Sequence, residues 1–136
     1  MDEAEARRKF QQARVARLAT ADVSGRPHAV PLVFAVEGDR IYSAVDAKPK
    51  RSHRLKRLAN VAANPRVSMI VDHYAEDWSA LWWVRADGSA QVIDDGPMRE
   101  RAITLLRAKY PQYHDTAGFG PAVVITVDHW TGWSVR

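Results

Sequence analysis

The sequence predicts a mainly β protein: an antiparallel sheet curled into a small barrel, with helices on its outside. Two observations favour this fold. Segments with strand character follow one another closely and are joined by short turns, as in hairpins. Segments with helical character occur at three places and are separated by groups of strands, so repeated units of strand, helix and parallel strand do not fit the order.

The first third of the chain predicts one helix followed by about three strands. Residues 2–13 form a polar helix whose acidic residues precede its basic residues, as the helix dipole favours. Residues 15–22 form a strand that ends in the turn signal VSGRP. Residues 27–46 form two strands joined at Gly38, which readily adopts the positive φ of a tight hairpin. The first of these strands has one apolar face, made of Val30, Leu32, Phe34 and Val36.

A second helix is expected over residues 50–63. Pro49 suits its start, and Asn64-Pro65 ends it. Its apolar residues are expected to share the face that packs on the barrel, with Val61 beside them: Leu55, Leu58 and Ala62.

The last part of the chain predicts strands around a third helix. Residues 66–74 form a strongly apolar strand, and residues 78–95 form a strand pair that turns or bulges near Ala86-Asp87-Gly88. Residues 97–111 form a helix, and residues 121–136 form the final strand. The inward residues of this helix are expected to be Ile103, Leu106 and Tyr110.

Composition limits the kinds of protein this chain can be. Its 136 residues suffice for one domain, which we expect to span residues 1–136. Cysteine is absent, which excludes disulfides, cysteine-ligated metals and thiol catalysis. The five histidines are scattered without metal-ligand spacing, so we expect no metal site. No apolar run is long enough to span a bilayer and the N-terminus is polar, so we expect a cytoplasmic protein without membrane insertion.

The segment DAKPKRSHRLKRLANVAANPR, residues 46–66, concentrates positive charge. It contains six basic residues within ten positions, and no acidic residue occurs from Ala47 to Val71. Cations at a helix N-terminus oppose the helix dipole, which a bound anion would offset. The pattern predicts a site for a discrete anion such as the phosphate of a cofactor. The basic residues are Lys48, Lys50, Arg51, Arg54, Lys56 and Arg57.

Two other interpretations of this segment are weighed against a phosphate site. A nucleic-acid surface usually interleaves aromatic residues with basic ones for base stacking, and Lys48 to Arg57 contains none, so we expect no nucleic-acid partner. A solvent-exposed helix face whose charges bind no ligand also explains the composition of this segment.

No nucleophile or nucleotide motif occurs: GxSxG, SxxK, Walker A and GxGxxG are all absent. An enzyme with this sequence would therefore depend on a bound cofactor for its chemistry. His28, at the start of a strand, is either a ligand contact or a structural residue. Trp82 and Trp83 are adjacent and point to opposite sheet faces, so one is expected in the core and the other outward, as packing or as a partner or ligand surface.

The segments RLATADVSGRPHAVPLVFAVEGDRIY and LKRLANVAANPRVSMIVD resemble the pyridoxamine 5′-phosphate oxidase-like split barrels. The segments DAKPKR and DHYAEDWSALWWVRADGSAQV, and the C-terminal W…GW, are similar to one branch in particular, the actinobacterial oxidoreductases that use the deazaflavin coenzyme F420. The resemblance extends from about residue 13 to residue 136. It implies a six-stranded split barrel that forms a homodimer, with two cofactor sites at the subunit interface.

The resemblance also implies the cofactor-binding residues. The family's phosphate-binding basic pair falls on Lys56-Arg57 when counted back from Asn64-Pro65. The helix is about one turn longer at its front, so Lys50-Arg51, with Lys48 as a neighbour, could equally hold the phosphate. Residues 28–30 and 67–69, which include His28 and Ser68, are implied near the ring. Trp78 lies where a partner subunit could close the site.

The function implied is an oxidoreductase that transfers a hydride from reduced F420 to an electron-poor organic acceptor. Six cations exceed what one phosphate needs, which favours F420 with its anionic tail over FMN. An FMN-binding oxidase or reductase and a non-catalytic carrier of flavin or haem are the alternatives. No residue is assigned as catalytic; Tyr74, His28 and solvent are the candidate proton sources. The sequence does not name the acceptor.

Overall fold

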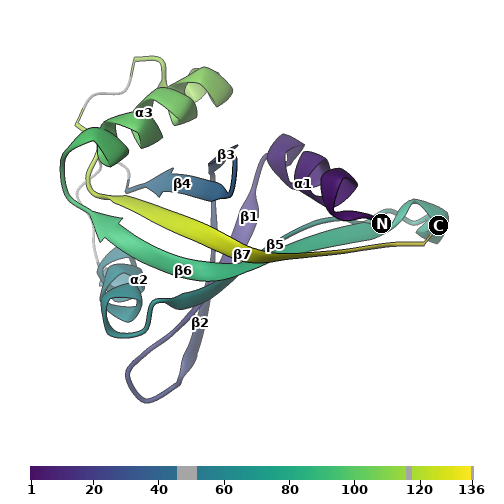
Figure 1. Ribbon diagram of the computed structural model, residues 1–136, viewed down its shortest axis with the longest axis horizontal. Coiled ribbons are helices and arrows are strands. Elements are labelled where there is room, and N and C mark those ends of the chain that lie inside the picture. Colours follow the sequence, from purple (N-terminus) through teal and green to yellow (C-terminus); the bar gives the residue numbers. More distant parts are fainter. Residues whose placement is uncertain (46–51, 116–117, 136) are drawn as a thin grey trace.

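The computed structural model describes residues 1–45, 52–115 and 118–135, with the backbone alone for residues 52–55. The longer elements are three α-helices and seven strands, joined in places by short 3₁₀ turns (Figure 1). In chain order they are α1 (Glu3–Gln12), β1 (Ala16–Ala21), β2 (Pro27–Leu32), β3 (Ala35–Glu37), β4 (Arg40–Ala44), α2 (Ser52–Ala63), β5 (Arg66–His73), β6 (Trp82–Ile93), α3 (Pro97–Lys109) and β7 (Ala122–Ser134).

The strands form one antiparallel sheet in the order β2-β1-β5-β6-β7-β4-β3. The two edge strands, β2 and β3, are consecutive in the chain, and Val33 and Phe34 alone separate them. Three Cα–Cα steps span at most about 11 Å, so the two edges of the sheet lie close together. The sheet is therefore curled into a barrel, as the sequence predicts.

The resemblance implies six strands and the sheet has seven, because the segment predicted as one strand before the hairpin is divided into β2 and β3. The Phe34 N–H donates to the Tyr110 hydroxyl (3.2 Å), and that hydroxyl lies 2.9 Å from the Phe34 carbonyl oxygen. The backbone at Phe34 thus bonds to the end of α3 and not to a neighbouring strand. The predicted apolar face is confirmed, since its four residues all pack in the same core.

The expected strand pair over residues 78–95 is also wrong: β6 is one continuous strand with a bulge. Asp87 pairs with His129 and Gly88 with Val127, so Asp128 on β7 is the extra residue. A Cβ on Gly88 would lie 2.2 Å from the Thr126 carbonyl oxygen. Glycine is therefore required by the close approach of β7, and the sequence signal that suggests a turn marks a bulge.

The helices complete the core from different sides, with α1 and α3 above the sheet and α2 below it in the view of Figure 1. In α1, the buried Phe10 ring lies 5.0 Å from the Phe34 ring and 5.3 Å from the Trp130 ring. The predicted inward face of α3 is confirmed, because Ile103, Leu106 and Tyr110 are all buried. Among the described helices, none has the length and apolar character needed to cross a membrane.

Candidate functional site

The helix α2 is anchored to β1 by a buried polar contact. The Asn60 side-chain amide donates to the Thr20 hydroxyl at 3.0 Å, and both residues are buried. This bond satisfies the amide, which is why Asn60 can lie in the interface. Val61, on the same side of the helix, enters the barrel core.

The expected packing face of α2 is therefore wrong in part. Leu58 packs against the core as predicted, but Ala62 is exposed and Arg57 is buried. The side chain of Leu55 lies outside the described residues. The interface follows the polar anchor at Asn60, so the helix is rotated away from the orientation that the aliphatic residues predict.

The basic residues of this segment fall into two groups. Lys48, Lys50 and Arg51 lie outside the described residues, as does the side chain of Arg54. Lys56 is exposed on α2, whereas the next residue, Arg57, is 9% exposed.

The charge of Lys56, on α2, acts at the end of β1. The pKa of Asp22, just after β1, is lowered first by the hydrogen bond from the Arg26 backbone N–H and further by the charges of Arg26 and Lys56. Lys56 is thus close enough to this strand end to act on a charged group there.

A groove of 350 Å³, which we call the β1–β5 groove, runs over the strands next to α2. The small side chains of Ala19 and Ala21 contribute to its wall, and Arg66 lies at the start of β5. Ala19, Ser68 and Asp87 are partners across β1, β5 and β6, so their side chains point to one face of the sheet. The lining residues are Ala19, Thr20, Ala21, Arg66, Val67, Ser68 and Asp87.

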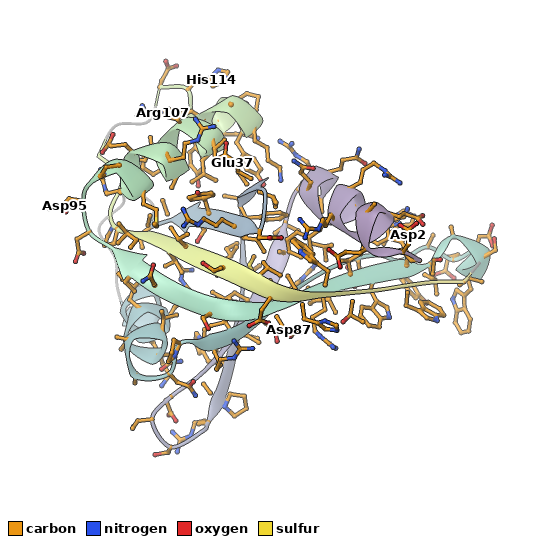
Figure 2. The ribbon with its side chains drawn as sticks, viewed as in Figure 1. Asp2, Glu37, Asp87, Asp95, Arg107 and His114 are labelled. Carbon is orange, nitrogen blue, oxygen red and sulfur yellow. The ribbon has the colours of Figure 1, made fainter. Side chains whose placement is uncertain are left out.

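Asp87 is the centre of a polar cluster in this groove. Its Oδ1 lies 2.5 Å from the Ser68 Oγ, and its Oδ2 accepts from the Arg85 Nε at 3.1 Å. The Arg85 guanidinium lies 5.8 Å from the centroid of the Trp83 ring. In Figure 2, Asp87 lies on the side of the sheet opposite α1 and α3.

Arg66 is held at the start of β5 by two polar contacts. It forms an ion pair with Asp128 at 2.8 Å and donates to the Ser89 hydroxyl at 3.1 Å. The hydrogen bond from Arg66 lowers the pKa of Asp128. Asp128 is the bulge residue, so the bulge supports the groove from β7.

The sequence does not identify Arg66, Arg85 or Asp87 as site residues. The Ala86-Asp87-Gly88 signal could have identified the position, because bulges often occur beside functional sites. It could not have identified the partners, since these depend on the register of β5 against β6.

Two predicted contacts, His28 and Ser68, lie on opposite faces of the sheet. His28 pairs with Thr20, whereas Ser68 pairs with Ala19, and successive residues of β1 point to opposite faces. The His28 Nδ1 atom is buried and has no hydrogen-bond partner within the described part of the chain. His28 borders the open edge of the sheet, because β2 is an edge strand.

Trp78 lies outside the β1–β5 groove, at the far end of the β5–β6 connection. Its side chain is 65% exposed and donates to the Tyr74 hydroxyl at 3.1 Å. The prediction for the adjacent tryptophans is confirmed: Trp82 packs against the core, and Trp83 lies on the other face opposite Trp133. A second hollow of 220 Å³ is lined by Tyr74, Trp82, Trp83 and Trp133 among others.

Sequence comparison connects this fold with a known family. The family model described as pyridoxamine 5′-phosphate oxidase matches residues 2–134. The chain belongs to this family. A curated relative, the 5a,11a-dehydrotetracycline/5a,11a-dehydrooxytetracycline reductase of Streptomyces rimosus, is 31% identical over 86 residues. That match covers 62% of this chain and spans about three fifths, 59%, of the length of the reductase.

Solved structures with the same fold include proteins of different kinds. The conserved hypothetical protein Rv2991 of Mycobacterium tuberculosis has a TM-score of 0.78 at 23% identity, over 100% of this chain and 86% of its own. A FAD-binding protein of Mesorhizobium loti has a TM-score of 0.74 at 24% identity, over 97% and 94%. The haem storage protein HutZ of Vibrio cholerae has a TM-score of 0.72 at 18% identity, over 97% and 93%. At these identities the similarity shows the fold alone.

Proposed function

We propose that this protein is a reductase that uses the deazaflavin coenzyme F420 to reduce an electron-poor organic acceptor. The observation that carries the proposal is the β1–β5 groove, which is lined by small and polar side chains and by the cation Arg66, in a chain of this family. The match to a reductase supports an oxidoreductase. The preference for F420 over FMN rests on the sequence resemblance and on the number of basic residues.

The described residues fit a planar cofactor with an anionic tail. Ala19 and Ala21 leave room for a flat ring where larger side chains would fill the groove, and Ser68 and Asp87 provide polar contacts beside it. Arg66 in the groove lining and Lys56 on α2 are positive and would attract a phosphate. We propose that Lys48, Lys50 and Arg51, outside the described residues, extend this charge, and that the buried Arg57 holds the phosphate from beneath.

When bound, the reduced deazaflavin supplies the hydride. The chain's own contribution would be to orient the ring on the groove floor and to limit the access of water. No described residue is assigned as the proton donor. Tyr74 is exposed, and His28 lies on the face of the sheet opposite Ser68.

A second copy of the chain would complete the site. The face that carries Ser68 and Asp87 also carries Ile70, which is 37% exposed, and Trp133, which is 46% exposed. We expect a second subunit to cover this apolar face. Within one subunit, Trp78 lies away from the groove. The Trp78 side chain of the second subunit could instead close over the cofactor of the first.

A titration tests the proposed function. The purified protein is titrated with F420, with FMN and with haem, and binding is followed by fluorescence or absorbance. Micromolar or tighter binding of F420, followed by oxidation of its reduced form by an enone or quinone, supports the proposal. Binding of FMN alone would assign the protein to the FMN enzymes of this fold. Binding of haem, or of F420 without turnover of any acceptor, would indicate a carrier.

A further inference from the structure

The cluster of Ser68, Asp87 and Arg85 restricts the ligand group that can bind at the groove floor. We propose that Asp87 is a positioning residue that makes the Ser68 hydroxyl a hydrogen-bond acceptor for a ligand N–H. The imide N–H of a flavin or deazaflavin ring is a group of this kind. The inference rests on the proposed function. It adds that the ligand must present a hydrogen-bond donor to Ser68.

The direction of each hydrogen bond carries the inference. An ionised carboxylate has no proton to give, so the single proton of Ser68 points to Asp87, 2.5 Å away. The other carboxylate oxygen accepts from the Arg85 Nε, so both oxygens of Asp87 act as acceptors. Ser68 is left with lone pairs toward the groove. A ligand atom that approaches its oxygen must therefore bring a hydrogen.

The fold holds this cluster in place from three sides. The cross-strand register sets Ser68 opposite Asp87, and Arg85 follows on the same face of β6. The bulge at Asp128 lies opposite Asp87 and Gly88, at a position where bulges re-aim side chains. The Asp87 side chain is 23% exposed, so its charge is partly shielded from water and its charge-assisted hydrogen bonds are strengthened.

Two synthetic ligands test the inference by binding alone. They are 5-deaza-FMN and its 3-methyl derivative, which differ by a methyl group on the imide nitrogen. We expect the wild-type protein to bind the N–H compound at least about 10-fold more tightly than the methylated one, since that is the value of one good hydrogen bond. Ser68→Ala should reduce this preference to less than about 3-fold. Asp87→Asn should do the same, because an asparagine amide can donate to Ser68 and release its proton toward the groove.

A matched control is available in the same chain. Asp39 forms an ion pair with Arg7 at 2.6 Å, away from the groove, so Asp39→Asn should keep the full preference. Circular dichroism checks that each variant folds. If Asp87→Asn does not fold, Ser68→Ala still tests the inference, because it removes a single oxygen atom. The inference is wrong if wild-type protein binds both compounds equally, or if both groove variants keep the preference. If wild-type protein binds neither compound and neither F420 nor FMN, the proposed function fails and the inference with it.

Discussion

At the residue scale, single polar atoms determine where the chain bends. The Tyr110 hydroxyl lies within hydrogen-bond distance of the N–H and the carbonyl of Phe34, and it is also 3.0 Å from the Arg14 carbonyl oxygen. Burial raises the pKa of Tyr110, so the hydroxyl keeps its proton at neutral pH. One side chain from α3 thus satisfies the backbone between β2 and β3.

Replacing Tyr110 by Phe should therefore destabilise the protein. The Phe34 N–H would lose its partner in a buried position, which costs about 1–3 kcal/mol. Urea unfolding of wild-type and variant protein measures the difference. Tyr74→Phe, at a tyrosine that is 64% exposed, is the control for loss of a hydroxyl. An unchanged midpoint for Tyr110→Phe would show that water replaces the hydroxyl.

Lys109 predicts a dependence of stability on pH. Its amine lies 3.9 Å from the Phe34 ring centroid and donates to the Gln11 carbonyl at 3.1 Å. Burial first, and then the charge of Arg14, lower the pKa of Lys109 from 10.5 to about 8. Between these two values the unfolded chain binds more protons than the folded one, so this group contributes stability that increases as pH rises.

The measurement compares wild-type protein with Lys109→Met. Relative to the variant, wild-type protein should gain free energy of unfolding as the pH is raised from about 8 to about 10, because the neutral amine no longer opposes burial. Subtracting the variant removes the contribution of the other titrating groups. A difference that stays constant over this range would contradict the lowered pKa.

At the scale of elements, the bulge in β6–β7 and the rotation of α2 both follow from close contacts between elements. Gly88 lets the β7 backbone approach β6, and the bond from Asn60 to Thr20 sets which side of α2 faces β1. Both features act on the groove: the bulge supports Asp87 and Arg66, and the rotation buries Arg57 while it leaves Lys56 exposed.

Gly88→Ala should destabilise the sheet at the bulge. The added methyl group would meet the Thr126 carbonyl oxygen, so the backbone must move, at a cost of about 1–3 kcal/mol or more. Thermal unfolding followed by circular dichroism measures the loss. Gly120→Ala is a useful comparison, since its Cβ would lie 3.2 Å from the Val45 Cβ, a much milder contact than 2.2 Å. Equal effects of the two substitutions would contradict the account of the bulge.

Lys56→Gln tests which turn of the basic segment holds the cofactor phosphate. If Lys56 binds it, affinity for F420 should fall by about 1–3 kcal/mol, the range for a lost charge-assisted hydrogen bond. Lys56 is exposed, so the unfolding midpoint should not change, whereas a change at the buried Arg57 would disturb packing as well. Lys50→Gln is the matched variant. Weaker binding in that variant alone would assign the phosphate to the Lys50-Arg51 turn.

At the scale of the whole molecule, the inner face of the curled sheet is covered, and its outer face is partly exposed. The barrel interior takes residues from α1 and α2, whereas α3 packs on β4 and β7 in a separate cluster. Ile70, Trp83 and Trp133 lie on the face away from the interior. Contiguous apolar surface of this kind on a sheet is typical of an interaction site. A homodimer through this face stays a prediction.

Ile70→Glu should disrupt such a homodimer. A charge placed at the centre of an apolar interface is not paired there, so the dimer should dissociate at micromolar concentration. Analytical ultracentrifugation of wild-type and variant protein gives the two masses. Val23→Glu is the control for an added charge, because Val23 is a loop residue that is 86% exposed. A wild-type protein that sediments as a monomer at all concentrations would exclude the dimer.

The sequence by itself determined the elements and their faces, because these follow from local periodicity: the positions of α1 and α3, the apolar faces of β2 and β3, and the opposite directions of Trp82 and Trp83. It also marked the basic segment that carries Lys56. The tertiary structure alone decided features that depend on distant partners. Phe34 divides a strand because Tyr110, 76 positions later, bonds to it. Asp87 meets Ser68 because two strands pair in one register, and no local pattern encodes that register.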